Sequence, residues 1–282
     1  MEKILEVKNL EKKYNQFSLK EIDLSINKNE IVGFIGKNGA GKTTLINCLM
    51  NFIRYDCDYY IFKDKEINND SYKYKSCIGY IGDTISMYPD STVGQMIDFY
   101  SNVFKDDWDG DKFKNYSKAF DLRNNIKIKN LSTGMKVKLF LLLVLSRKPE
   151  ILILDEPTSG LDPIIRNEII SMLRKYQSDE QGTIFFSSHI TEDIEMLANR
   201  IIYIDNGKIL LDIKKEDLNR IYKKVDLKEN ESFKLDERVV VNDKWGVIDL
   251  RDYLKDNLDK NVLYDCSLLD VYIYIRRRMK NV

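Results

Sequence analysis

The sequence feature that most constrains this chain is a glycine-rich loop at residues 36–44, with the sequence GKNGAGKTT. It follows an apolar run, residues 31–35, that has the character of a buried strand, and it precedes an apolar stretch, residues 45–50, that suits a helix. A strand, a glycine-rich loop and a helix in this order form the setting that a phosphate-binding P-loop requires. The sequence therefore predicts a nucleotide-binding site here.

The residue types of this loop suit phosphate binding. Glycines let backbone N–H groups turn inward around phosphate oxygens, and the N-terminus of the following helix adds roughly half a positive charge. Lys42 is predicted to reach the β- and γ-phosphates, and the Thr43 hydroxyl is predicted to bind Mg²⁺. The predicted nucleotide contacts in the loop are Asn38, Gly39, Ala40, Gly41, Lys42, Thr43 and Thr44.

Composition and charge narrow the class of protein. The 282 residues suffice for a large domain and a smaller one, and 45 Lys and Arg balance 45 Asp and Glu, so no nucleic-acid partner is expected. The four cysteines have no metal-like spacing and are typical of reduced cysteines in a cytosolic protein. The longest apolar run, residues 139–145, is far shorter than the roughly 20 residues that span a bilayer. We expect a soluble chain whose membrane role comes through a partner.

Two further predicted strands end in reactive side chains. Residues 150–154, continuously apolar after Glu150, predict a strand buried on both faces of a parallel sheet, and Asp155 and Glu156 follow it. Because open α/β sheets hold ligands at the carboxyl ends of their strands, Asp155 is predicted to bind Mg²⁺ and Glu156 to polarise an attacking water. The strand predicted over 183–188 ends at His189, the single histidine, which is either incidental or converges on the same edge.

Two other positions each leave two interpretations open. Tyr14 precedes an alternating strand pattern at residues 22–26, typical of an antiparallel sheet. It is either an edge aromatic or a ring that stacks on adenine, a contact worth about 1–3 kcal/mol for bases in general. Ser132 precedes a helical stretch, residues 136–147, and is either a plain N-cap or, with Gly134, part of an anion-binding turn.

The pattern changes after a hairpin whose turn, Asn206-Gly207, favours type I′. We expect the nucleotide-binding domain to close near residue 212 and residues 213–282 to form an accessory region whose removal leaves nucleotide binding intact. The basic run at 276–280 is either a solvated helix end or a contact for acidic lipid or a partner. Within the accessory region, a surface helix and linker are predicted over 214–230, and a small α+β unit is predicted from residues 238–241, 245–248 and 268–279.

Taken in order, these motifs resemble those of the ATP-binding subunit of an ABC transporter. The resemblance covers residues 1 to about 212, and its style looks most like bacterial ATPases of the ABC-2 exporter group. It rests on a Walker A stretch at 36–44, a signature at 131–135, a Walker B run at 151–156, the following loop at 159–162, a switch histidine at His189 and an adenine-stacking aromatic at Tyr14.

This resemblance implies a fold and a mechanism. The fold is an α/β P-loop NTPase domain with a RecA-like core, an antiparallel β subdomain, a helical subdomain at about 84–147, and a small C-terminal α+β appendix. Two such domains, as a homodimer or a heterodimer, sandwich two ATP molecules, and Ser132 and Gly134 of one contact the γ-phosphate held by the other. Glu156 is then the general base, His189 holds the γ-phosphate, and the loop at Asp162 links the two sites.

Three positions depart from the commonest pattern of that family. Thr133 stands where glycine is usual and Met135 where glutamine is usual, although their backbone N–H groups remain as donors. Asp83 replaces the glutamine that usually ends its strand. The resemblance implies that Asp83 is a Mg²⁺ ligand or a coupling residue, although a carboxylate near the γ-phosphate is repulsive unless Mg²⁺ offsets it.

The expected function is hydrolysis of ATP, with Mg²⁺, to drive a membrane-embedded ABC exporter, of antimicrobial peptides or drugs. The expected location is cytoplasmic, at the inner face of the cell membrane through a transporter membrane subunit. One alternative is a soluble ABC ATPase that acts on nucleic acid or ribosomes, and the single set of motifs argues against it. Another is an ATP-dependent regulatory sensor, against which the intact Lys42, Asp155, Glu156 and His189 argue.

Overall fold

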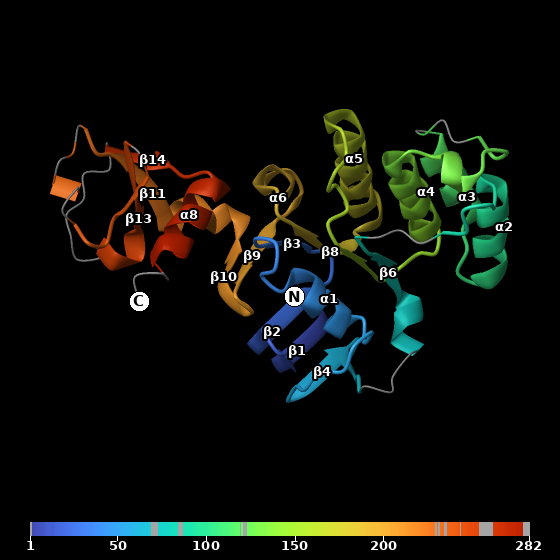
Figure 1. Ribbon diagram of the computed structural model, residues 1–282, viewed down its shortest axis with the longest axis horizontal. Helices are drawn as coiled ribbons and strands as arrows, with labels where there is room; N and C mark the ends of the chain where they lie inside the picture. Colours follow the sequence, from blue (N-terminus) through green and yellow to red (C-terminus); the bar gives the residue numbers. More distant parts are fainter. Residues whose placement is uncertain are drawn as a thin grey trace.

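The computed structural model describes residues 2–68, 73–83, 87–118, 120, 123–228, 230, 232–233, 236–242, 244–253 and 262–278. Within these residues the strands form three sheets (Figure 1). The first is antiparallel, as its alternating sequence predicts, and has the order β2-β1-β4-β5. Its strands are β1 (Lys3–Lys13), β2 (Ser18–Asn27), β4 (Tyr59–Phe62) and β5 (Lys65–Glu66).

The second sheet is the centre of the molecule, with the order β10-β9-β3-β8-β7-β6. All neighbours are parallel except the β9–β10 hairpin, so five strands end at one edge. The predicted I′ turn is confirmed by positive φ angles at Asn206 and Gly207. The strands are β3 (Ile31–Ile35), β6 (Ile78–Ile81), β7 (Ile151–Leu154), β8 (Thr183–Ser188), β9 (Arg200–Asp205) and β10 (Lys208–Lys214).

Helices cover both faces of the central sheet (Figure 1). The helix α1 (Lys42–Leu49) lies between it and the antiparallel sheet, and the apolar side chains of these three layers form one core cluster. The helices α5 (Pro163–Glu180) and α6 (Thr191–Leu197) cover the opposite face. Because both faces are covered, β3, β7 and β8 are buried along their whole length, as their continuous apolar runs predict.

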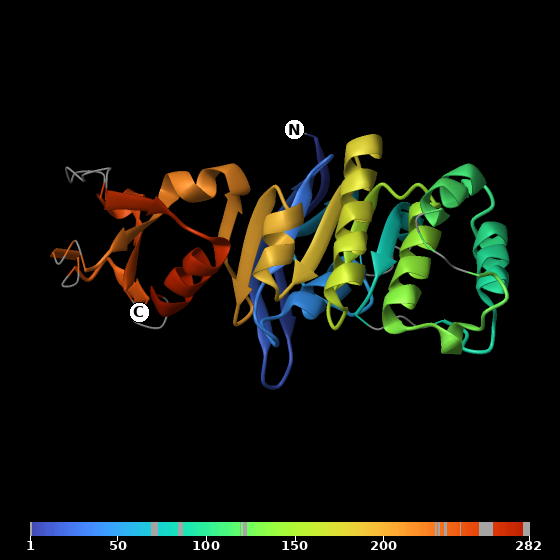
Figure 2. The ribbon, with the colours of Figure 1, turned by 90° about the horizontal axis from the view of Figure 1, so that it is seen from above.

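A helical segment lies beyond β6, at the end of the molecule opposite the C-terminal unit (Figures 1 and 2). A capping box at Thr92 and Gln95 starts its first helix. Of the subdomain predicted at about 84–147, residues 84–86, 119 and 121–122 lie outside the described part. The elements of this segment are α2 (Val93–Val103), α3 (Gly110–Ser117), η2 (Ile128–Asn130) and α4 (Thr133–Leu145). A 3-10 helix, η1 (Lys73–Cys77), comes before β6 in the chain.

The C-terminal unit is the predicted α+β unit, with a third sheet in the order β12-β13-β11-β14. The surface helix predicted over 214–230 is wrong, because the described residues of this range form only a 3-10 turn at 215–217 and a single α-helical turn at 218–221, which a strand follows. That strand is central: Tyr222 faces one apolar cluster and Val225 another, so both of its faces are buried. The elements are η3 (Lys215–Asp217), α7 (Leu218–Ile221), β11 (Tyr222–Asp226), β12 (Val240–Asn242), β13 (Trp245–Asp249), η5 (Leu250–Tyr253), β14 (Leu263–Asp265) and α8 (Leu268–Arg278).

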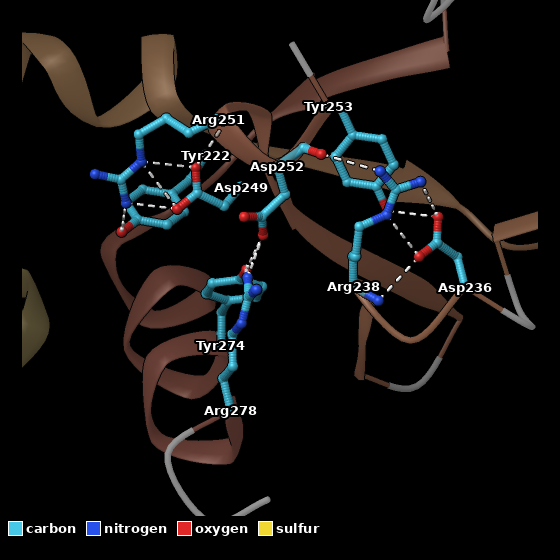
Figure 3. Close-up of polar contacts among 9 residues, drawn as sticks. All are labelled: Tyr222, Asp236, Arg238, Asp249, Arg251, Asp252, Tyr253, Tyr274 and Arg278. Atoms are coloured by element: carbon cyan, nitrogen blue, oxygen red, sulfur yellow. Dashed lines mark hydrogen bonds and ion pairs between the residues drawn. The ribbon is translucent and has the colours of Figure 1, made fainter. Parts of the chain in front are cut away.

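Three arginines of this unit are held by aspartates and tyrosines (Figure 3). Arg238 pairs with Asp236 at 2.9 Å and lies over the ring of Tyr253. Arg251 makes a paired contact with Asp249 at 2.5 Å, and its Nη2 donates to the Tyr222 hydroxyl at 3.2 Å. Arg278, in the basic run, pairs with Asp252. Arg278 is therefore paired within the chain, and both interpretations of the basic run stay predictions; residues 279–280 lie outside the described part.

The C-terminal unit shares a hydrophobic core with the nucleotide-binding part. Leu268 of α8 belongs to the same apolar cluster as Tyr203 of β9, whose ring meets that of Tyr272 at 4.8 Å between centroids. The backbone N–H of Leu268 also donates to Glu195 of α6 at 2.6 Å. The predicted boundary after residue 212 stays a prediction, and in the structure β10 runs on to Lys214.

Two adjacent leucines test this shared core. Leu268 is 3 % exposed and Leu269 is 49 % exposed. We expect Leu268→Ala to lower the free energy of unfolding by about 2–5 kcal/mol, because it leaves a cavity, and Leu269→Ala to change it by less than about 0.5 kcal/mol. Thermal unfolding followed by calorimetry measures both. A separate low-temperature transition that alone responds to Leu268→Ala would contradict a common core.

Candidate nucleotide-binding and hydrolysis site

The P-loop joins the end of β3 to the start of α1, as predicted. Gly41 caps α1 with a φ of +113°, a conformation that side chains rarely adopt. A Cβ there would also lie 2.7 Å from the ring of Phe17 and 2.8 Å from Leu19. The glycine is therefore required both by the turn and by the strand β2 that packs against it.

Lys42 is enclosed by its own loop. Its Nζ donates to the carbonyl oxygens of Gly36 at 2.7 Å and Lys37 at 3.2 Å, and it lies 3.1 Å from Oε1 of Glu156. Its side chain is 6 % exposed. The ammonium therefore sits at the centre of the loop, held by two carbonyls and a carboxylate.

The remaining loop residues differ in exposure. Asn38, Gly39 and Thr43 are exposed, Thr44 is half-buried, and Ala40 is buried. The loop is also held from β9 and its turn, a contact that the sequence did not indicate. Lys37 pairs with Asp205 at 2.8 Å, and the carbonyl of Ala40 accepts from the Gly207 N–H at 3.0 Å.

Asp155 is fully buried at the end of β7. The Ser187 hydroxyl donates to its Oδ1 at 2.6 Å, whereas no hydrogen-bond partner of Oδ2 is found among the described residues. Burial raises the pKa of the Asp155 carboxyl, hydrogen bonds from Ser187 and Thr43 oppose that rise, and the charge of Asp83 adds to it. Asp83 is itself exposed. Thr43 and Asp155 thus lie next to each other, and Asp83 is close enough for its charge to act on Asp155.

Glu156 and His189 are in contact, although they are 33 residues apart in the chain. The imidazole Nδ1 lies 2.7 Å from Oε2 of Glu156, and the Glu156 side chain is 13 % exposed. The backbone of Glu156 is left-handed, with a φ of 52°, which costs about 1–2 kcal/mol for a residue with a side chain. Its N–H donates to the Ser187 hydroxyl at 2.9 Å, which supports this conformation.

Tyr14 is half exposed, at 50 %, in the turn between β1 and β2. The Lys12 ammonium lies 5.1 Å from the centre of its ring. The described structure holds no contact that decides between its two interpretations.

The signature residues lie away from the P-loop. Ser132 caps α4 by accepting from the Met135 N–H at 3.2 Å, and α4 is separated from α1 in both views (Figures 1 and 2). Gly134 is buried against α5, where a Cβ would lie 2.7 Å from Ile165. Asp162 caps α5 and accepts from two backbone N–H groups at 3.0 Å.

Sequence reasoning missed Ser187, which contacts both Asp155 and the backbone of Glu156. Its signal was its position, because it is the second-last residue of a strand predicted to lie beside the strand that carries both carboxylates. Polar residues at buried strand ends deserve the same scrutiny as the charged residues that follow them.

Comparisons with known proteins identify the family of the chain. The profile of the ABC transporter family matches residues 19–159. The linearmycin resistance ATP-binding protein LnrL of Bacillus subtilis is 32 % identical over 222 residues, 76 % of this chain and 70 % of LnrL. The ABC transporter ATP-binding protein YtrB of the same organism is 29 % identical over 209 residues, 74 % of this chain and 71 % of YtrB.

Solved structures agree on the fold. One titled as the ATP binding subunit of an ABC transporter has a TM-score of 0.68 at 22 % identity and covers 77 % of this chain and 92 % of that one. The dimeric post-hydrolysis state of the cassette MJ0796 with ADP and Pi has a TM-score of 0.65 at 22 % identity, covering 74 % and 98 %.

The site and the fold define an ATP-binding cassette with an ATPase domain. The chain belongs to the ABC transporter family, as an ATP-binding subunit. In the part of the chain that the structure describes, no helix has the length and apolar character needed to cross a bilayer.

The buried carboxylate of Asp155 predicts a conflict between stability and function. Its pKa is raised on folding, so stability is lost as pH rises through the folded-state pKa. We expect Asp155→Asn to raise the melting temperature of the nucleotide-free protein at a pH where the carboxylate is ionised, by a margin that shrinks as the pH is lowered, and to abolish ATP hydrolysis. Asp111→Asn, at a carboxylate that is 91 % exposed, is the control. A lower melting temperature for Asp155→Asn would contradict the argument.

Proposed function

We propose that this chain hydrolyses ATP at the carboxyl edge of its central sheet and drives a membrane-embedded ABC exporter. One observation carries the proposal: Lys42, Glu156 and His189, from three separate segments, form a continuous chain of contacts. Asp155 lies one residue from Glu156. These are the groups needed to bind a phosphate, to orient a water and to stabilise the transferred group.

Each residue has a distinct proposed role. Lys42 transfers its ion pair from Glu156 to the β- and γ-phosphates when ATP binds. Glu156, released from the ammonium, accepts a proton from the attacking water as general base. His189 holds the γ-phosphate, and its contact with Glu156 keeps the two groups together. Tyr14 stacks on adenine, and the other loop contacts are Asn38, Gly39, Ala40, Gly41, Thr43 and Thr44.

Mg²⁺ fits the residues present. Asp155 offers a buried oxygen without a hydrogen-bond partner among the described residues, and the Thr43 hydroxyl is near the same carboxylate. Mg²⁺ is usually held by one or two protein oxygens together with phosphates and waters, which suits this small set. When bound, it neutralises charge that develops on the phosphates. Asp83, whose charge acts on Asp155, is proposed either as a further Mg²⁺ ligand or as a coupling residue.

A second ATP-binding domain completes the proposed site. Ser132, Gly134 and Asp162 lie at helix starts, and Ser132 and Asp162 are exposed. The separation of α4 from α1 supports a role in trans, in which these residues of one copy contact ATP on the P-loop of the other (Figure 1). We propose residues 1–212 as the ATP-binding domain and 213–282 as its accessory region.

The proposal extends to a membrane partner and to the cargo that is exported. Exposed aromatic side chains support a partner, since Tyr88 is 64 % and Phe99 47 % exposed although their rings pack at 6.2 Å. Two relatives are named for linearmycin resistance and, as probable, for multidrug transport. We therefore propose export of antimicrobial peptides or drugs.

Glu156→Gln tests the proposed general base. We expect ATP binding to persist while turnover falls about 10²–10⁴-fold, because the amide cannot accept the proton of the water. ATP should then accumulate in a dimer, measured by size-exclusion chromatography with light scattering. Glu150→Gln, at the other end of β7, is the matched control and should leave turnover unchanged. Turnover that survives in Glu156→Gln would remove the assigned role.

Affinity purification of the tagged protein from detergent-solubilised cells tests the partner. The proposal expects a polytopic membrane protein in stoichiometric amount. Ribosomes or nucleic acid in its place would favour a soluble ABC ATPase, and a soluble regulator would favour an ATP-dependent sensor.

A further inference from the structure

A buried carboxylate outside the proposed catalytic group binds two parts of the chain at once. Asp193 is 1 % exposed, on the inner face of α6. The Thr158 hydroxyl donates to its Oδ2, and Arg166 Nε donates to its Oδ1. Thr158 is itself 4 % exposed. Both carboxylate oxygens are thus used, in a place where an unpaired charge would be costly.

The two donors flank one loop. Thr158 lies four residues before Asp162, and Arg166 lies four residues after it. The intervening residues Ser159 and Gly160 are exposed, so most of this loop faces solvent while both of its ends are fixed. The Asp193 side chain therefore holds the chain just before the loop, at Thr158, and just after it, at Arg166 in the first turn of α5.

The same side chain lies close in sequence to His189. Asp193 is four residues after His189 and Thr158 is two residues after Glu156. The Glu156 backbone is in a strained left-handed conformation, which surrounding contacts must maintain. The contact of Thr158 with Asp193 ties the chain after Glu156 to the chain after His189, beside the 2.7 Å contact between those two side chains.

We propose that Asp193 is a positioning residue, which fixes to α6 the two residues that flank the loop at 159–162, Thr158 and Arg166, and thereby holds Glu156 against His189. The inference rests on the proposed function of that pair. It also implies that the loop at 159–162 and His189 change position together. A displacement of reacting groups by about 1 Å can reduce a rate about 10²-fold, so a modest loosening has a measurable effect.

Substitutions at Thr158 test this without leaving Asp193 unpaired. Thr158→Val keeps the shape but removes the donated hydrogen, while Arg166 still pairs with Asp193. We expect turnover to fall at least about tenfold with the dissociation constant for ATP within about twofold of the wild type. Thr158→Ser restores the hydroxyl and should recover turnover to within about twofold. Thr191→Val removes a half-exposed hydroxyl from the same helix and is the matched control.

Arg166→Gln provides a second, independent variant, because it loosens the other end of the loop and its side chain is 24 % exposed. The proposal expects the same loss of turnover at unchanged ATP affinity, with melting temperatures reported for every variant. Wild-type turnover in both Thr158→Val and Arg166→Gln overturns it, as does a loss of ATP affinity that matches the loss of turnover.

Glu156→Gln, assayed in parallel, separates the two possible failures. If Glu156→Gln is inactive while Thr158→Val and Arg166→Gln are fully active, only the positioning role fails. If Glu156→Gln itself turns over normally, the proposed function of the pair fails.

Discussion

The contact between the Lys42 ammonium and the Glu156 carboxylate is the interaction on which the site depends. Both groups are largely removed from water, and a buried charge is stable only when it is paired or well hydrogen-bonded. Lys42 is held by two carbonyls of its own loop, and Glu156 by His189. In the proposed function, a phosphate of ATP replaces Glu156 beside Lys42. That exchange would free the Glu156 carboxylate for its proposed role as general base.

This arrangement requires a rigid frame, which the parallel sheet supplies. Five strands end at one edge, so residues far apart in sequence become neighbours without long side chains having to reach one another. The β9–β10 turn adds a brace, through Asp205 to Lys37 and Gly207 to Ala40. The strand β9 also packs through Tyr203 on the C-terminal unit. The strand β9 and its turn thus contact both the P-loop and the C-terminal unit.

The sequence predicted the fold class and the core elements because each depends on a local pattern. Continuous apolar runs indicated β3, β7 and β8, and the Asn206-Gly207 pair indicated the hairpin. The helix predicted over 214–230 is wrong for a physical reason. In β11 Tyr222 enters one apolar cluster and Val225 enters another, and this three-residue spacing in a charged sequence fits a helix equally well. Only the partner strands decide between the two structures.

The tertiary contacts of the site could not be predicted from the sequence either. The sequence indicated Lys42, Asp155, Glu156 and His189 individually, from their places beside a glycine-rich loop or at strand ends. Their mutual contacts, the bridging role of Ser187 and the buried bonds of Asp193 depend on how strands pair and how α6 packs. Asp193 in particular looks like an ordinary charged residue on a short helix. The roles of all the site residues stay predictions, including those of Tyr14, Asp83, Ser132, Gly134 and Asp162.

The most direct test of this account is a crystal structure of the protein with Mg²⁺ and a non-hydrolysable ATP analogue. The account predicts that Lys42 Nζ leaves Glu156 and lies within hydrogen-bond distance of β- and γ-phosphate oxygens. It also predicts that Thr43 and Asp155 lie around the metal and that Glu156 and His189 face the γ-phosphate. A nucleotide bound elsewhere, or a Lys42–Glu156 pair that persists beside the bound phosphates, would contradict it.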